Sequence, residues 1–334
     1  MAADEASVMT VPAGLSVYTV CNARYFPALV LLVASVERHA PGTPLTVYDV
    51  GLDDVQRVWL RTRATIVDGT AARRAVPSLD KAFAATLDPS GPILIIDADG
   101  LVAGDLGPLV EKARAGSIVA AVDPMATRRV AAWSDRFGLQ APLRVQRYVG
   151  AGTVLLDADV HGGLLRRWWD LCGVASDRYA EWRADPDEPL MHNDQDVLNA
   201  LLMSEVPEGA VEHFTTEQMA ASLFMPGVRL HDRRRLVFSG PGGGPLVVQC
   251  MTQAKPFLPE GGASLFGSAY TMALRAVLVD EARRSDPGGA VDPSVLVPWL
   301  RPGPLGAIRF RWRTVWIRTR KALGRWRARY LPHR

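Results

Sequence analysis

Apolar and polar residues alternate over residues 1–120 between short β-branched runs and longer segments with helical spacing. This alternation predicts an α/β protein with a mostly parallel central sheet and helices on both faces. The expected strands are residues 15–20, 45–50, 64–67, 92–96, 118–121, 153–156 and 246–250, and the expected helices are residues 26–39, 53–63, 78–87 and 195–203. Ligands of such sheets bind beyond the carboxyl ends of the strands. We therefore expect the functional site in the loops after Val20, Ile96 and Leu156.

Composition and the positions of Gly and Pro divide the chain of 334 residues into four expected segments. These are a flexible N-terminus (1–14), a folded body (15–283), a linker rich in Pro and Gly (284–307) and a basic aromatic tail (308–334). With 48% hydrophobic residues the body can bury a large core. The sequence contains no run of 18 apolar residues, so we expect no membrane span. The acidic N-terminus is unlike a signal peptide. Together with three scattered cysteines, expected to be free thiols, this indicates a cytoplasmic protein.

The charge is strongly segregated along the chain. Residues 301–334 contain eleven Lys and Arg and no Asp or Glu, although the whole chain carries a net charge of only +3. Of the 38 basic residues 27 then remain, against 35 acidic ones, so the rest of the chain carries −8. Any electrostatic attraction to an anionic partner therefore belongs to the tail.

The tail has the spacing of an amphipathic helix over residues 308–330. One face collects the apolar residues Ile308, Trp312, Val315, Trp316, Ala322, Leu323, Trp326 and Tyr330. Tryptophan and arginine on such a helix are typical of an anchor at an anionic membrane surface. The alternatives are packing of the helix on the body, or nonspecific attraction of nucleic acid, which we do not expect as a partner.

Two carboxylates directly follow the most apolar expected strand. Asp97 and Asp99 stand two residues apart, so in an extended segment they point to the same side. Such a pair can hold a hard divalent ion, Mg²⁺ or Mn²⁺, which would bridge the oxygens of a diphosphate. The alternative is a solvated turn after a strand.

The same Asp-x-Asp-Gly pattern occurs in haloacid-dehalogenase-like phosphatases, whose first Asp is a nucleophile. In those enzymes Thr or Val stands two residues after the second Asp, where this chain has Leu101. Their motif also lies near the start of the domain, whereas here about 90 residues precede it. The phosphatase remains a second enzyme hypothesis.

Several segments resemble, in the same order, the family 8 glycosyltransferases, which include bacterial lipopolysaccharide galactosyl- and glucosyltransferases. The segments are VYTVCNARY (17–25), VYDVGL (47–52), ILIIDADGLVAGDLGPL (93–109), YVGAGTVLLD (148–157), HNDQDVLNALL (192–202) and QCMTQAKPF (249–257). The resemblance implies that residues 15–283 form a GT-A catalytic domain, the nucleotide-diphospho-sugar transferase fold. It further implies transfer of a sugar, with retention, from a UDP-sugar to a carbohydrate or glycolipid acceptor, with Mn²⁺ or Mg²⁺.

The resemblance assigns a role to each matching residue. It places Asn22 and Tyr25 at the uracil, where a phenol supplies a flat apolar face with a polar tip. Ala98 and Gly150 also line the donor site in this reading. The metal ligands are Asp97, Asp99 and Gln249, Lys255 neutralises the diphosphate, and Asp194 and Gln195 lie beside the reacting sugar. For Asp194 the alternative is a helix cap, since Asn193–Asp194 precedes a helical segment.

Four positions depart from the family pattern. Gln249 stands where the family has a metal-ligating His, and Thr252 stands where it has Gly. Gly150 replaces an Asn, and Asn22 replaces an Asp. An amide oxygen suits a hard ion better than a soft one. These departures leave open a third hypothesis, a sugar-nucleotide-binding protein that has lost catalysis.

Overall fold

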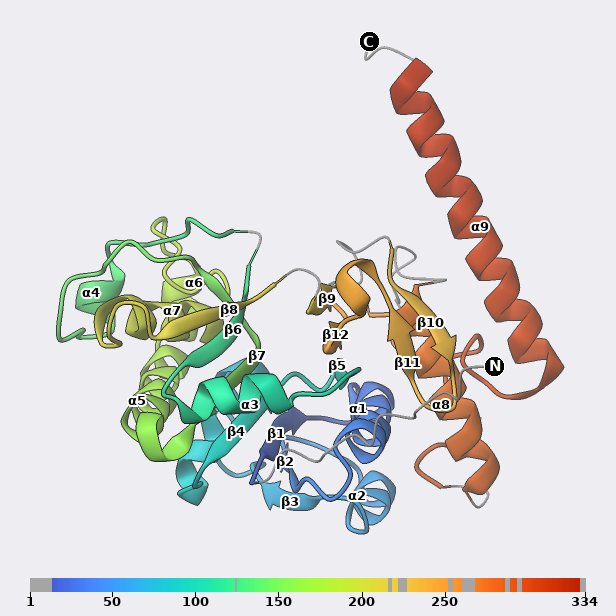
Figure 1. The fold of residues 1–334 in the computed structure, drawn as a ribbon, viewed down its shortest axis with the longest axis horizontal. Coiled ribbons are helices and arrows are strands. Elements are labelled where there is room, and N and C mark those ends of the chain that lie inside the picture. Colours follow the sequence, from blue (N-terminus) through green and yellow to red (C-terminus); the bar gives the residue numbers. More distant parts are fainter. Residues whose placement is uncertain are drawn as a thin grey trace, which may run out of the picture.

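A computed structural model describes residues 14–123, 125–215, 218–221, 227–251, 255–259, 268–285, 289–292 and 296–330. The expected flexible segment 1–14, apart from Gly14, and residues 331–334 of the expected tail lie outside these ranges, as does Thr252. Figure 1 shows an α/β body with a long C-terminal helix that stands away from it.

A seven-stranded sheet forms the centre of the body, with the strand order β3-β2-β1-β4-β7-β6-β8. The strands are β1 (Ser16–Cys21), β2 (Leu45–Asp49), β3 (Thr65–Asp68), β4 (Pro92–Ile96), β6 (Ile118–Val122), β7 (Val149–Asp157) and β8 (Val211–Phe214). All neighbouring pairs are parallel except those of β7, which runs antiparallel to β4 and to β6. The predicted α/β fold with a mostly parallel sheet is thereby confirmed.

Strand β4 is buried on both faces, as its unbroken apolar sequence predicts. Leu94 and Ile96 belong to the core on one face, and Ile93 and Ile95 to the core on the other. The first core is covered by α1 (Phe26–His39), α3 (Gly107–Arg114) and α8 (Ala269–Arg284). The second is covered by the 3₁₀ helix η1 (Pro77–Leu87), α5 (Ala158–Asp177) and α7 (Asp194–Ser204). Helices on both faces therefore hold β4 at the centre of the molecule.

Two of the elements that differ from the sequence-based expectation bear on the site. Strand β7 spans nine residues, where only 153–156 were expected, because Gly150, Ala151 and Gly152 have weak strand propensity. Val149, which precedes them, pairs with Val122 of β6 across a register shift. Helix α5 was not expected. It forms because Leu165, Trp168 and Leu171 pack into the core beneath it.

Smaller elements complete the fold. A second sheet has the order β5-β12-β9, built from β5 (Gly100–Val102), β12 (Val247–Gln249) and β9 (Met219–Ala221). Strands β10 (Arg229–Asp232) and β11 (Val237–Ser239) form a hairpin that packs near α8. The remaining helices are α2 (Asp54–Leu60), α4 (Trp133–Arg136), α6 (Tyr179–Arg183) and α9 (Gly303–Tyr330).

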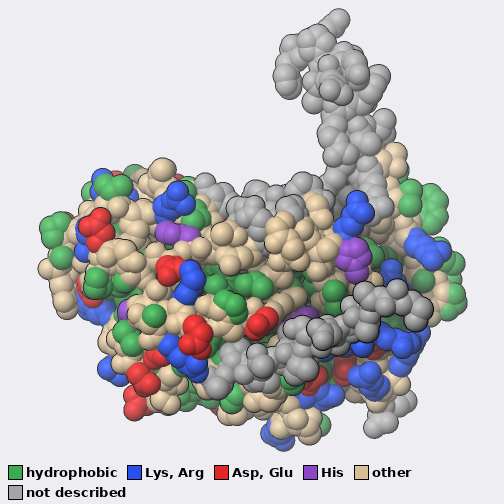
Figure 2. Space-filling model, in the orientation of Figure 1, with side chains coloured by type: hydrophobic (Ala, Val, Ile, Leu, Met, Phe, Trp, Pro, Cys, Tyr) green, Lys and Arg blue, Asp and Glu red, His purple; other side chains and the backbone are tan. Residues whose placement is uncertain are grey.

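The three cysteines are free and buried, as expected. Among the described residues, no helix is long and apolar enough to cross a membrane. Figure 2 shows acidic and basic side chains interspersed over the visible face of the body.

Helix α7 is fastened to the start of β7 by one buried amide. The Asn199 side chain accepts a hydrogen bond from the backbone N–H of Val149 and donates one to its carbonyl, both at 2.8 Å. It also donates to the carbonyl of Gln195 at 2.8 Å. Since these groups are buried, the amide fixes how α7 lies against the sheet.

Replacing this amide should loosen the junction between α7 and β7. We expect Asn199→Ala to lower the free energy of unfolding by about 2–4 kcal/mol, because it leaves buried backbone groups of Val149 without partners. Urea denaturation of this variant and of Gln140→Ala, a change at an exposed loop position, measures the effect. Equal stabilities of the two variants would show that the amide does not hold this junction.

Candidate functional site

The carboxyl end of β4 is where the sequence-predicted residues meet. Asp97 donates its backbone N–H to the carbonyl of Gly152 on β7 at 2.9 Å. On the other side, Cys250 donates its N–H to the carbonyl of Asp99 at 3.2 Å. Because β7 runs antiparallel to β4, it is the start of β7 that lies at this edge. Backbone contacts therefore place the acidic pair between β7 and the segment after β12.

Asp97 lies between a lysine and an amide. Its Oδ1 is 2.8 Å from the ammonium of Lys81, and its Oδ2 accepts a hydrogen bond from Gln249 Nε2 at 2.9 Å. About a third of the side chain (31%) remains exposed to solvent. The predicted partner Gln249 is thus in direct contact with the acidic pair, and its amide nitrogen faces Asp97.

Asp99 is more deeply buried and pairs with Lys255. Its Oδ2 lies 2.5 Å from Lys255 Nζ, and that ammonium also donates to the carbonyl of Cys250 at 2.7 Å. Burial raises the pKa of Asp99; the Lys255 ammonium opposes the increase, whereas Asp97 adds to it. For Lys255, burial lowers the pKa but Asp99 outweighs it, so the pKa is raised. Lys255 is therefore a firmly charged ammonium at the acidic pair.

Lys81 was not predicted from the sequence, yet it joins two of the predicted residues. Its ammonium lies 2.8 Å from Asp97 Oδ1 and 2.9 Å from Asp194 Oδ2, and it is almost fully buried. Burial lowers the pKa of Lys81, but Asp194 and then Asp97 outweigh this and raise it. The signal was present in the sequence as one lysine within the apolar segment SLDKAFAATL, since a buried lysine needs carboxylate partners.

Asp194 opens α7 with its carboxylate turned toward Lys81. Burial raises the pKa of Asp194, while Lys81 opposes this. The preceding Asn193 has a φ of 51° and its side chain makes no capping hydrogen bond, so the turn relies on a residue type that tolerates this backbone region. Trp168 of α5 donates its indole N–H to the Asp194 carbonyl at 3.2 Å. The carboxylate thus takes part in the charged cluster.

Gln195 is held between two strand ends. Its Oε1 accepts from the backbone N–H of Ala151 on β7 at 3.2 Å, and its Nε2 donates to Asp123 Oδ2 at 3.1 Å. The side chain therefore stands beside Gly150, where a Cβ would lie 3.8 Å from Gln195 Oε1. Gln195 is linked to the charged cluster through β7 and through its neighbour Asp194.

A buried network beneath the start of α7 was also missed by the sequence reasoning. Asp196 accepts from the Tyr148 hydroxyl at 2.7 Å and from Arg128 Nε at 2.8 Å. It also accepts from the backbone N–H of His192 at 2.7 Å. These bonds brace the turn that presents Asp194 and Gln195.

Gly152 allows the closest approach in the site. A Cβ at this position would lie 1.9 Å from Gln249 Nε2 and 2.8 Å from Asp97 Oδ2, so these two side chains would have to shift. The Asp97–Gln249 contact therefore requires glycine here. Ala98, between the two acidic residues, is buried.

Asn22 and Tyr25 form the turn after β1. Asn22 Oδ1 accepts from the Tyr25 backbone N–H at 3.2 Å. The Tyr25 ring packs edge-to-face on Phe257 with centroids 5.3 Å apart, and Lys255 Nζ lies 6.0 Å from its centroid. These two residues thus border the cluster on the Lys255 side and do not enter it.

The donor atoms fit a hard cation. Within the described ranges, no group of three or more His, Cys, Asp or Glu side chains could hold a metal ion. The available set is instead two carboxylates, Asp97 and Asp99, and the Gln249 amide, whose oxygen and nitrogen exchange places on rotation. Three carboxylates, counting Asp194, face the two ammonium groups of Lys81 and Lys255, which gives the cluster a formal charge of −1 when every group is ionised. Oxygen ligands and residual negative charge suit Mg²⁺ or Mn²⁺.

Comparisons with solved structures agree with this architecture. No protein-family model and no curated protein matches the chain. A crystal structure of the galactosyltransferase LgtC with donor and acceptor sugar analogues aligns with a TM-score of 0.50 at 18% identity, covering 78% of this chain and 95% of LgtC. The bifunctional glycosyltransferase WbbM aligns with a TM-score of 0.51 at 13% identity, covering 79% of this chain and 49% of WbbM.

The glycosyltransferase GlyE of Streptococcus pneumoniae aligns with a TM-score of 0.50 at 14% identity, covering 86% of this chain and 65% of GlyE. The chain therefore spans most of LgtC, about half of WbbM and just under two thirds of GlyE. At these identities the likeness establishes the fold. It confirms the GT-A fold that the sequence resemblance predicted.

The lysine bridge should contribute strongly to stability. We expect Lys81→Met to lower the free energy of unfolding by about 3–5 kcal/mol, because it leaves the buried Asp194 carboxylate without its counter-charge. Urea denaturation at neutral pH measures this. Adding Asp194→Asn should recover most of the loss, since the uncompensated charge is then gone.

Lys112→Met is the matched control for that experiment. Lys112 pairs with Glu212 at the surface, so its loss should cost at most about 1 kcal/mol. Similar losses for the two lysines, or no recovery on adding Asp194→Asn, would contradict the bridge.

Proposed function

We propose that the protein is a glycosyltransferase that moves a sugar from a UDP-sugar to an acceptor hydroxyl. The observation that carries the proposal is the cluster at the end of β4, where Asp97 contacts Gln249 and Asp99 contacts Lys255. Two segments that are about 150 residues apart in the sequence, and that both resemble motifs of the family, thus lie in contact. The fold shared with LgtC and GlyE supports the same reaction class.

Asp97, Asp99 and the Gln249 amide oxygen would hold a divalent cation, Mn²⁺ or Mg²⁺. Such an ion, when bound, neutralises charge on the diphosphate and so favours departure of the nucleotide. Lys255 adds a second positive charge from the protein itself. Its ammonium lies at Asp99 and beside the Tyr25 ring, so a diphosphate at this edge meets it directly.

The nucleotide base is assigned to the Asn22–Tyr25 turn, next to Ala98. Tyr25 is half-buried and braced by Phe257, which leaves an aromatic surface at the rim of the cluster. A base stacked there places the diphosphate toward Lys255 and the sugar toward β7 and α7. Gly150, without a side chain, leaves room beside Gln195 for the sugar.

Asp194 and Gln195 are assigned to the reacting sugar. Lys81 lies 2.9 Å from Asp194 and opposes the increase in pKa that burial causes. Ala151 and Asp123 fix the Gln195 amide. Charge that develops on the leaving phosphate meets Lys255, and preorganised charges of this kind usually supply the largest share of rate enhancement. The acceptor hydroxyl gives its proton to the departing phosphate or to a nearby group. Retention of configuration is part of the proposal.

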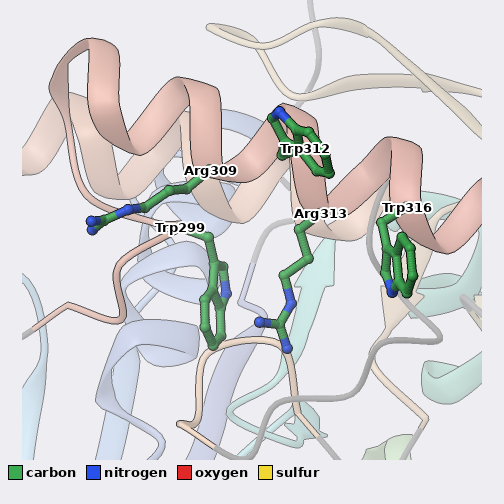
Figure 3. A pocket seen from close by; sticks show the side chains of 5 residues that line it. All are labelled: Trp299, Arg309, Trp312, Arg313 and Trp316. Carbon is green, nitrogen blue, oxygen red and sulfur yellow. The ribbon is translucent and has the colours of Figure 1, made fainter.

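We further propose that the protein acts at the cytoplasmic surface of a membrane, on a lipid-linked or membrane-proximal acceptor. Helix α9 exposes a set of large apolar side chains: Leu305, Ile308, Trp312, Val315 and Trp316. Figure 3 shows Arg313 beside Trp299 beneath the helix, with Arg309, Trp312 and Trp316 around the same pocket. Each Lys or Arg near an anionic leaflet adds about 1 kcal/mol of attraction.

The metal and the nucleotide should bind together. We expect UDP to raise the melting temperature by several degrees in the presence of Mn²⁺ and by little without it, because a ligand stabilises the state that binds it. Gly152→Ala should abolish this increase, because its methyl group displaces Gln249 from Asp97. Gly163→Ala, at a position with nothing within 4 Å, should keep it.

The same proteins separate the alternative functions. Hydrolysis of one member of a panel of nucleotide-sugars, lost in Gly152→Ala, supports the transferase. UDP binding without turnover of any donor points to the sugar-nucleotide-binding protein. Release of phosphate from small phosphoesters, with no response to UDP, would favour the phosphatase and contradict the proposal.

Membrane association should depend on the exposed face of α9. We expect the triple variant Ile308→Gln, Trp312→Gln and Trp316→Gln to lose most of its co-sedimentation with vesicles containing anionic phospholipid, because insertion of apolar side chains is removed. The control triple variant changes Val58, Val145 and Val160, which are exposed on the body, to Gln. Equal pelleting of the two variants would refute the role of this face.

A further inference from the structure

A second pocket lies where α8, α9 and the turn between β10 and β11 meet. Its volume is about 530 Å³. Figure 1 shows these elements on the same side of the molecule, away from the carboxyl end of β4. The pocket is therefore separate from the cluster that contains Asp97 and Lys255.

Three arginines line this pocket from three different elements. Arg275 comes from α8, Arg311 from α9, and Arg233 from the turn after β10. Among the described residues, no Asp or Glu lines it. Three guanidinium groups therefore surround one cavity that no carboxylate of the described residues lines. Their positive charges repel one another, and a bound anion would reduce this repulsion.

Arg275 shows the strain of this arrangement most directly. Burial lowers its pKa, and the nearby Arg233, Arg283 and Arg311 lower it further. One of its terminal nitrogens donates to the carbonyl of Arg301 at 3.4 Å, but its buried Nε has no hydrogen-bond partner. A buried donor without a partner is destabilising, and an acceptor in the pocket would remove that cost.

The other wall of the pocket is apolar. Met272 of α8 and Phe310 and Val315 of α9 supply most of it, and the Arg275 guanidinium lies 5.4 Å from the Phe310 ring centroid. Val315 is largely exposed and continues into the apolar face of α9. A ligand that fits both walls carries an anionic head and an aliphatic chain.

We propose that this pocket binds the phosphate head of a lipid, with the aliphatic chain along the wall of Met272, Phe310 and Val315. A tetrahedral phosphate accepts hydrogen bonds from several guanidinium groups at once, and Arg matches its geometry well. The chain leaves the pocket along the exposed face of α9. The inference concerns binding alone and does not rest on sugar transfer.

Binding of octyl phosphate tests the proposal on the full-length protein. Isothermal titration calorimetry below the micelle concentration would compare it with inorganic phosphate, which has the head alone, and octyl glucoside, which has the chain alone. We expect both to bind at least about tenfold more weakly than octyl phosphate, a difference of about 1.4 kcal/mol.

Two double variants separate the pocket from general electrostatic attraction. Arg233→Ala with Arg311→Ala removes two of the lining charges, and both side chains are exposed, so the fold should be kept. Arg235→Ala with Arg309→Ala removes the same charge from the same turn and the same helix, but outside this pocket. We expect the first pair to weaken octyl phosphate binding at least about tenfold, and the second less than about threefold.

Several outcomes would overturn the proposal. Equal losses in the two double variants would show that net charge alone attracts the ligand. Inorganic phosphate binding as tightly as octyl phosphate would leave the apolar wall without a role. Octyl glucoside binding as tightly as octyl phosphate would show that the arginines have no role in binding. Loss of UDP binding in a separate assay would bear on the proposed transferase and leave this result unchanged.

Discussion

The buried ammonium of Lys81, placed between Asp97 and Asp194, is the constraint on which the rest of the site depends. It joins η1 to the end of β4 and to the start of α7, three elements that are far apart in the sequence. Removing such charges from water costs several kcal/mol per ion, and apolar side chains of similar volume often stabilise a core better. Stability alone therefore does not account for three carboxylates and two lysines at one strand end, which supports placing the proposed reaction there.

The direction of β7 decides which part of this strand lies beside the charged cluster. Had β7 run parallel to β4, its end would have met Asp97; because it is antiparallel, its glycine-rich start does so. Gly152 then permits Gln249 to reach Asp97, and Asn199 holds the same stretch of β7 against α7. A strand start with poor intrinsic propensity is thus useful at this point, since the absent side chains make room for other groups. The carbonyl of Gly152 accepts a hydrogen bond from the Asp97 N–H, which helps to hold this stretch beside the end of β4.

Much of this arrangement could be predicted from the sequence. Continuous apolar runs identified β4 and α1, and the ordered motifs placed Asp97, Asp99, Gln249 and Lys255 in one site. Lys81 could not be assigned in this way, because its importance lies in two contacts with residues that no local pattern connects to it. The start of β7 was missed for a related reason, since Gly150 and Gly152 have weak strand propensity and their conformation depends on contacts across the fold. Local preference predicts elements well, whereas partners across the fold decide which polar residues matter.

In the C-terminal helix α9, the apolar face predicted from the sequence differs in part from the face that contacts the body. The sequence placed one apolar face on a basic helix, but Phe310, which lies off that face, packs against the body and under Arg275. A helix stabilised only by the body would turn its tryptophans inward, yet Trp312 and Trp316 are about two-thirds exposed, at 69% and 61%. Helix α9 therefore has two apolar sides, one already used and one still facing water. Residues 301–334 contain eleven basic residues and no acidic one, so their charge favours anionic partners on this side. The arginine pocket at the base of the same helix favours the same charge. The proposed surface, with phosphate heads above aliphatic chains, would suit both features at once.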